Sequence, residues 1–202
     1  RMVLSPPPIP VHFRYDGEQK KKRVICVARW LKPDWAQKTP TMLLASLAAF
    51  LKLKPDYEAV VVGRGANDLR QAKFYPAALN DLPIRFVNAI PNAELTTLYK
   101  ESRISFCPSY RESFHLASFE AASCGCSIVA LDSPDVPALQ WLAESDGTLA
   151  DCGSAQAFTE ALCSEAQLWD QDKRAPHEIS NRWTNELWST QAAQRIVNQL
   201  HL

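Results

Sequence analysis

The 202-residue sequence has no apolar run that approaches the roughly 18 residues needed to span a bilayer, so no transmembrane segment is predicted. It also has no excess of either charge, because 22 basic residues balance 22 acidic ones, and no global field favours nucleic acid or an anionic membrane. Cysteine and histidine pairs at metal-ligand spacing are missing too, so we predict no metal site. Any anion-binding site must therefore be local.

The sequence shows no pattern of a secretory leader, and its cysteines are interpreted as reduced thiols of a cytoplasmic protein. Six cysteines are spread through the predicted strands and helices: Cys26, Cys107, Cys124, Cys126, Cys152 and Cys163. Cys124 and Cys126 could bind a metal or form a redox couple, but small residues at a helix end suit a tight turn, which is the interpretation we favour. The first residue is Arg1 rather than Met, and we expect a piece of a longer or processed chain.

Short apolar runs alternate with helical segments along most of the chain. Strands are predicted at residues 24–28, 59–62, 84–87, 104–107, 128–131 and 148–150. Helices are predicted from Pro40 with Thr39 as N-cap, from Ala93 with Asn92 as cap, up to Gly125, over 134–143, after the cap Ser154 through Trp169, and over 180–200. This alternation predicts an α/β fold, a Rossmann-like parallel sheet with helices on both faces.

The two ends of the chain are expected to lie outside this domain. Residues 1–23 contain a proline-rich stretch and the basic run Lys20–Arg23, which we interpret as an interdomain linker. The basic run could bind nucleic acid or lipid, but a solvated entrance to a buried strand is the favoured interpretation. Residues 24–175 are predicted to form the domain and residues 176–202 a C-terminal helix. Of two tryptophans on that helix, we expect one to pack on the domain.

The stretch from Pro108 to Leu131 reads as strand end, polar turn, helix and strand. Glu112 stands in the turn and Glu120 about two turns inside the helix, eight positions later. Eight helical steps rotate by roughly 80° beyond two full turns and rise about 12 Å, so both carboxylates can face one side. Between them lies a helix N-terminus, which is suited to phosphate. The layout complements a nucleotide sugar, which has hydroxyls at both ends and a diphosphate in the middle.

This stretch resembles the signature of the family 4 (group 1) retaining glycosyltransferases. The resemblance is carried by Pro108-Ser109, by the two glutamates, by Ser113-Phe114 and by Glu120 to Gly125. In that family the segment belongs to the C-terminal, donor-binding domain of the two-domain GT-B fold. The resemblance implies that Glu112 contacts donor-sugar hydroxyls and Glu120 the ribose. It implies contact with the distal phosphate for the backbone of Phe114, His115 and Leu116, and it places Ser113 among the donor-binding residues.

Further donor contacts follow from the resemblance at other strand ends. Arg29 and Lys38 occupy the places of two cations that pair with the donor diphosphate. The loop between them is longer than is usual in the family, and it leaves Lys32 as a competitor for the role of Lys38. The expected position of Arg29 is the carboxyl end of the first strand, where ligands of such sheets bind.

Two more positions match family sites after the second and third strands. Gly63 and Gly65 stand where the family has Gly-x-Gly, and the missing side chain is expected to let the chain pass near the ligand. The third glycine of the dinucleotide fingerprint is missing, so we do not predict NAD binding. Ile90 stands where the family offers main-chain groups to the base.

The predicted function is transfer of a sugar, with retention, from a nucleoside-diphosphate donor to an acceptor hydroxyl. We expect a hexosyltransferase with no cofactor and no metal, because two cations and a helix N-terminus supply the positive charge. The expected partners are the nucleotide-sugar donor and a missing N-terminal, acceptor-binding domain, without which the chain is expected to be inactive. Any association with a membrane would be carried by that missing domain.

Two alternatives stay open. One is a non-catalytic nucleotide-sugar-binding or scaffold domain, and the other is a GT-B relative that epimerises nucleotide sugars, although that group does not share the two-glutamate motif. The largest departure from the family is His115, where the family has glycine. Its side chain could block the phosphate, add a donor to it, or mark a site that binds without catalysis. Ser127 replaces a common proline, which we interpret as structural.

Overall fold

The structure is a computed structural model that describes residues 7–200. Its centre is a six-stranded sheet in which every neighbouring pair of strands is parallel. The strands are β1 Lys21–Val27, β2 Glu58–Val62, β3 Ile84–Val87, β4 Ser102–Cys107, β5 Ser127–Leu131 and β6 Gly147–Ala150. Their order across the sheet is β3-β2-β1-β4-β5-β6. The chain builds one half of the sheet outward from β1 and the other half outward from β4, so the strand order reverses between these two strands. The predicted Rossmann-like fold is confirmed.

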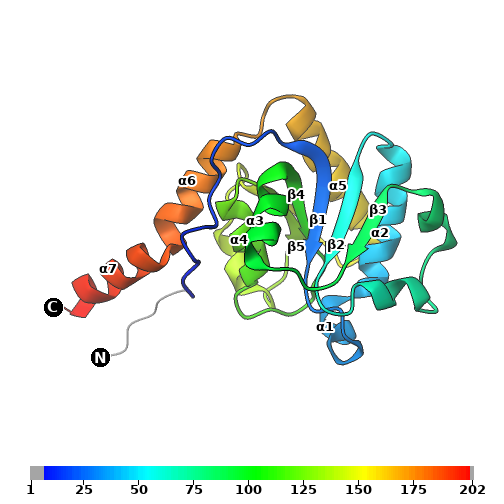
Figure 1. The fold of residues 1–202 in the computed structure, drawn as a ribbon, viewed down its shortest axis with the longest axis horizontal. Coiled ribbons are helices and arrows are strands. Elements are labelled where there is room, and N and C mark those ends of the chain that lie inside the picture. The colour runs from blue at the N-terminus through cyan, green and yellow to red at the C-terminus, as the bar shows by residue number, and fades with distance from the viewer. Residues whose placement is uncertain (1–6, 201–202) are drawn as a thin grey trace.

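Helices cover both faces of the sheet (Figure 1). One face carries α2 Pro40–Leu53 and α5 Ala155–Asp170, and the other carries α3 Asn92–Glu101, α4 Leu116–Ser123 and α6 Pro176–Leu187. The single turn α1 Trp35–Lys38 follows β1, and α7 Ser189–Leu200 extends away from the sheet (Figure 1). Four 3-10 helices complete the connections: η1 Lys32–Asp34, η2 Asn67–Gln71, η3 Ala77–Asp81 and η4 Pro137–Trp141. None of the helices in residues 7–200 is long and apolar enough to cross a bilayer.

The strands are apolar on both sides because each side faces a layer of helices. In β1, Val24 and Cys26 pack into the cluster formed with α2 and α5, whereas Ile25 packs into the cluster on the opposite face. Phe119 of α4 lies in that second cluster, with its ring centroid 4.7 Å from that of Trp183 on α6. Two cores therefore hold the sheet from both sides and fix the position of α4.

Several helix boundaries differ from those predicted. Thr39 takes a left-handed conformation and makes no side-chain cap, and Asn92 is the first residue of α3 rather than its cap. Residues 134–143 form only the short η4, whereas the predicted cap Ser154 accepts a hydrogen bond from the Ala157 amide. The last predicted helix is divided into α6 and α7 at Trp188.

The described segment before β1, residues 7–20, packs against the domain. Ile9 and Phe13 are buried, and the Ile9 amide donates to the Leu187 carbonyl at 2.8 Å. The Ile9 carbonyl in turn accepts from the Ser189 amide, which interrupts the helical hydrogen bonds where α6 meets α7. Trp183 is buried in the domain body, and the Trp188 indole donates to the Phe13 carbonyl.

The basic run before the first strand is paired with protein groups. Lys20 donates to the Cys124 carbonyl at the end of α4, and Lys21 begins β1 and pairs with Glu101. Arg23 is buried and pairs with Glu58 and Glu101. The prediction that this run is solvated is wrong for Lys20 and Arg23, whose side chains are bonded to protein groups. The run therefore forms no open basic patch for nucleic acid or lipid. The division into linker, domain and C-terminal helix stays a prediction.

Candidate functional site

The candidate site lies where the carboxyl ends of β1 and β4 meet. These strands are neighbours, but the chain leaves them toward opposite edges of the sheet, so the loops that follow them diverge. Such a reversal opens a crevice in which α/β sheets bind ligands. The loop after β1 ends in Lys38, and the loop after β4 runs through Glu112 to the start of α4.

Three hydrogen bonds tie these two loops together. The Thr39 hydroxyl donates to the Pro108 carbonyl at 2.6 Å, and the Tyr110 amide donates to the Gln37 carbonyl at 3.0 Å. The Gln37 side-chain amide donates to the Arg111 carbonyl at 2.7 Å. The sequence suggested Thr39 only as a helix cap. Its hydroxyl instead bonds to the loop after β4, so Thr39 is a site residue that sequence reasoning missed.

The tied loops bring two of the predicted catalytic residues into contact. The Lys38 ammonium group forms an ion pair with the Glu112 carboxylate, and the two side chains are 13% and 12% exposed. The Glu112 amide donates to the Asp135 carbonyl at 3.0 Å, which fixes the backbone of the turn. A nearly buried cation and carboxylate therefore stand together at the edge of the crevice.

The turn before α4 and the first two residues of α4 present unbonded amides beside this pair. His115 has a left-handed backbone with φ of 39°, and its carbonyl accepts from the Ser118 amide. Among residues 7–200, no acceptor is found for the amides of residues 113–117. Phe114 stacks on Phe119, with ring centroids 4.9 Å apart, which holds the turn against the core. Free amides at the positive end of a helix make a site that suits an anion.

The side chain of His115 is turned into the protein. It is 5% exposed, and its Nε2 lies 2.5 Å from the Cys107 Sγ. Burial is the largest single effect on the pKa of this imidazole and lowers it, but the Cys107 sulfur and the Glu112 carboxylate together raise it, so the net pKa is above its ordinary value. The Cys107 pKa moves the opposite way, because the histidine and Ser109 outweigh the effect of burial. The imidazole is thus packed below the turn, and its Nδ1 is buried without a partner among the described residues.

The Glu120 side chain lies further along α4 and makes no hydrogen bond or ion pair with the described residues. Burial raises the pKa of its carboxyl to about 7. Its neighbours include Tyr99 on α3, whose pKa is raised first by burial and then by the nearby carboxylate, and Cys124 at the end of α4. Glu120 is therefore a half-buried acceptor that is not engaged by the protein.

Other predicted residues make no hydrogen bond or ion pair with Glu112 in the described part of the chain. Arg29 is exposed and pairs with Asp34 at 3.3 Å, and Lys32 lines a separate pocket beside the tryptophans of its loop. Ile90 is half-buried, packs on the second core cluster and precedes α3. The structure thus places Lys38, and not Lys32, next to the acidic motif.

The two predicted glycines are explained by contacts within the protein. A Cβ at Gly63 would lie 1.9 Å from the Ala28 carbonyl oxygen, and one at Gly65 would lie 2.9 Å from the Trp30 carbonyl oxygen. Both glycines have positive φ. They allow the loops after β1 and β2 to touch, and a role beside a ligand stays a prediction.

Comparison with known proteins identifies the family. The sequence profile described as "Glycosyl transferases group 1" matches residues 21–166, which is well over half of the chain. The chain belongs to this family of glycosyltransferases.

Relatives and solved structures agree with this membership. A D-inositol 3-phosphate glycosyltransferase of Corynebacterium jeikeium is 33% identical over 107 residues, covering 50% of the chain and 26% of the relative. The crystal structure of WaaG, a glycosyltransferase involved in lipopolysaccharide biosynthesis, superposes with a TM-score of 0.73 at 15% identity. This match covers 96% of the present group 1 glycosyltransferase chain and 55% of WaaG. The crystal structure of Anabaena Alr3699/HepE in complex with UDP and glucose gives a TM-score of 0.70 at 17% identity. This match covers 90% of the present chain and 48% of the HepE chain.

These comparisons fix the fold of the group 1 glycosyltransferase chain as one Rossmann-like unit of the GT-B type. The chain spans about a quarter of the first relative and about half of each of the two structures. Within residues 7–200, no group of three or more His, Cys, Asp or Glu side chains could hold a metal ion.

Proposed function

We propose that this chain is the donor-binding half of a retaining glycosyltransferase and binds a nucleoside-diphosphate sugar at the start of α4. The observation that carries the proposal is the run of unbonded amides at residues 113–117, beside the Lys38–Glu112 pair at the reversal of the sheet. Backbone amides and one ammonium group supply the positive charge that a diphosphate leaving group requires. The glycosyltransferase family and the UDP complex of a structural neighbour support this choice of ligand.

Each side chain has a distinct part in this proposal. The distal phosphate accepts hydrogen bonds from the amides at the start of α4. The Lys38 side chain moves from Glu112 to the diphosphate. Glu112 is thereby released to accept hydrogen bonds from hydroxyls of the donor sugar, which it orients. Glu120, which is not engaged by the protein, accepts the ribose hydroxyls. No step requires a metal or a cofactor, and transfer requires an acceptor-binding domain outside this chain.

Titration calorimetry of the chain with UDP, GDP, ADP and their glucose or mannose conjugates tests this proposal. We expect at least one conjugate to bind with a Kd in roughly the 0.1 to 1 mM range, because only one side of the cleft is present. Glu120→Ala should abolish this binding, whereas the exposed α5 variant Glu160→Ala should not change it. Binding by the chain without transfer by the longer protein would indicate a nucleotide-sugar-binding or scaffold domain instead. Absence of binding to every conjugate would refute the proposal.

The raised pKa of Glu120 predicts that donor affinity depends on pH. Below about pH 7 the carboxyl keeps its proton, and a neutral acid accepts fewer hydrogen bonds from ribose than a carboxylate does. Affinity for UDP-glucose should therefore rise by about tenfold between about pH 6 and pH 8. UDP-glucose is the suitable probe, because its diphosphate is a diester and has no ionisation of its own in this range.

The matched control for this titration is Glu120→Gln, which cannot ionise but keeps the shape of the side chain. We expect its affinity to be low and nearly independent of pH over the same range. His115, whose pKa is also shifted, remains in both proteins, so any pH dependence that it causes will be common to them. An equal slope in the two proteins would show that Glu120 does not bind the donor.

A further inference from the structure

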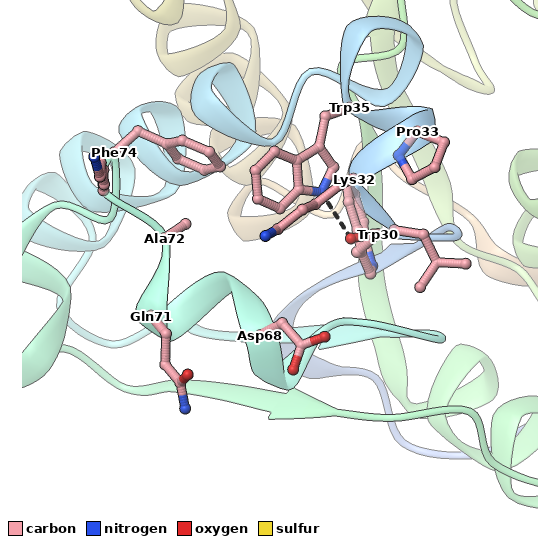
Figure 2. Close-up of a pocket in the computed structure, with 10 residues that line it drawn as sticks. Trp30, Lys32, Pro33, Trp35, Asp68, Gln71, Ala72 and Phe74 are labelled. Carbon is pink, nitrogen blue, oxygen red and sulfur yellow. Dashed lines mark hydrogen bonds between the residues drawn. The ribbon is translucent and has the colours of Figure 1, made fainter.

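A separate pocket of about 970 Å³ lies between the loop after β1 and the segment after β2. Its lining includes Trp30, Lys32, Trp35, Asp68, Lys73 and Phe74 (Figure 2). None of these residues belongs to the α4 turn or to the acidic motif. The volume lies within the range of about 300 to 1,000 Å³ that is typical of small-molecule sites.

The aromatic wall of this pocket is held in place by hydrogen bonds. Trp30 is buried, and its indole donates to the Val62 carbonyl at 2.9 Å. The Trp35 indole donates to the Trp30 carbonyl at 2.7 Å, the bond drawn in Figure 2. Phe74, from the facing segment, meets Trp35 edge to face with ring centroids 5.0 Å apart. The rings are therefore positioned before any ligand arrives.

The polar groups of the pocket are not committed to partners in the protein. Within residues 7–200, Lys32, Asp68 and Lys73 take part in no ion pair. In Figure 2 the Lys32 ammonium group points into the space beside the Trp35 ring, and Asp68 comes from the facing segment. A hydrogen-bond acceptor and donors therefore surround an aromatic wall.

We propose that this pocket binds the ring of a saccharide, apart from the donor site. A pyranose has an apolar C–H face that packs on an aromatic ring and a rim of hydroxyls that both donate and accept. Asp68 and Lys32 are exposed, and a purely aromatic ligand would make no hydrogen bonds to them. A saccharide satisfies both kinds of group.

The pocket and the donor site share a loop. The residues that lengthen the loop between Arg29 and Lys38 are the ones that form the aromatic wall, so the same loop lines the pocket and carries the ammonium group of the donor site. The binding of a saccharide here does not rest on the proposed function.

Nuclear magnetic resonance of the ¹⁵N-labelled chain tests this assignment, with methyl α-glucoside, methyl α-galactoside, methyl α-mannoside and glucuronate as probes. We expect at least one probe to shift the Trp35 indole signal with a Kd in the millimolar range, saturating by about 50 mM. Asp68→Ala should weaken this binding about tenfold. Asp81→Ala is the matched control, because Asp81 is also exposed in a 3-10 helix of the same connection but does not line the pocket.

Trp35→Ala is expected to abolish saccharide binding, and circular dichroism of that variant checks that it is folded. Asp68→Ala keeps the aromatic wall, so the proposal remains testable if the tryptophan variant does not fold. The proposal is overturned if no probe shifts the Trp35 indole, or if Asp68→Ala and Asp81→Ala bind alike. UDP-glucose affinity measured in Asp68→Ala should not change. Saccharide binding without any UDP-glucose binding would keep the pocket and refute the donor site.

Discussion

Gly63→Ala is expected to destabilise the chain by more than about 4 kcal/mol, a loss that is exceptional for one methyl group. The added Cβ would lie 1.9 Å from the Ala28 carbonyl oxygen, and the φ of 129° is strained for any residue with a side chain. Relief requires β1 and β2 to separate at their carboxyl ends, which breaks the ladder and displaces the loop that leads to Lys38. Urea unfolding followed by circular dichroism measures the loss.

Gly17→Ala is the matched control for this substitution. Gly17 also has a positive φ, of 101°, but the nearest atom to its added Cβ is the His177 Nε2 at 4.0 Å. Its loss should therefore be limited to backbone strain, on the order of 1 to 2 kcal/mol. If the two variants lose the same stability, the contact with Ala28 does not explain the glycine at position 63.

Lys38→Met is expected to destabilise the chain by about 3 kcal/mol and to abolish donor binding. The substitution leaves the Glu112 carboxylate, which is 12% exposed, without its cation. Removing one member of a buried ion pair costs more than removing both, because the remaining charge stays desolvated. Unfolding in urea gives the change in stability, and calorimetry with UDP-glucose gives the change in affinity.

A double-mutant cycle separates the ion pair from other effects of the lysine. Lys38→Met combined with Glu112→Gln should recover about half or more of the stability lost in the lysine variant, because no unpaired charge remains. Donor binding should stay absent in the double variant, since both groups are needed for the ligand. Additive losses in stability would show that the two side chains do not form the pair seen here.

The strands were predictable because each is a short apolar run that two helix layers bury. The run Ala59–Val62, for example, lies within β2 as predicted, and each of these four residues is buried. The pairing of Lys38 with Glu112 was not predictable, because it joins loops 74 positions apart that only the order of the strands brings together. The motif indicated the right helix end, but not what its glutamate contacts.

The differences at helix ends arise from groups that are distant in the sequence. Thr39 does not cap α2 because its hydroxyl donates to the Pro108 carbonyl. The helix predicted over 180–200 is interrupted because Ile9 forms backbone hydrogen bonds on either side of Trp188. Arg29 pairs with Asp34, five residues later, and not with the acidic motif. Local patterns contain no signal for such competition between partners.

The account depends on the binding of a diphosphate by the first turn of α4. Backbone amide shifts of the ¹⁵N-labelled chain, followed during titration with UDP-glucose, test this most directly. We predict that the largest shifts fall on the amides of residues 113–117, which have no acceptor among residues 7–200, and that Lys38→Met abolishes these shifts. Saturable binding of UDP-glucose that leaves those amides unmoved, or no binding at all, would contradict the account.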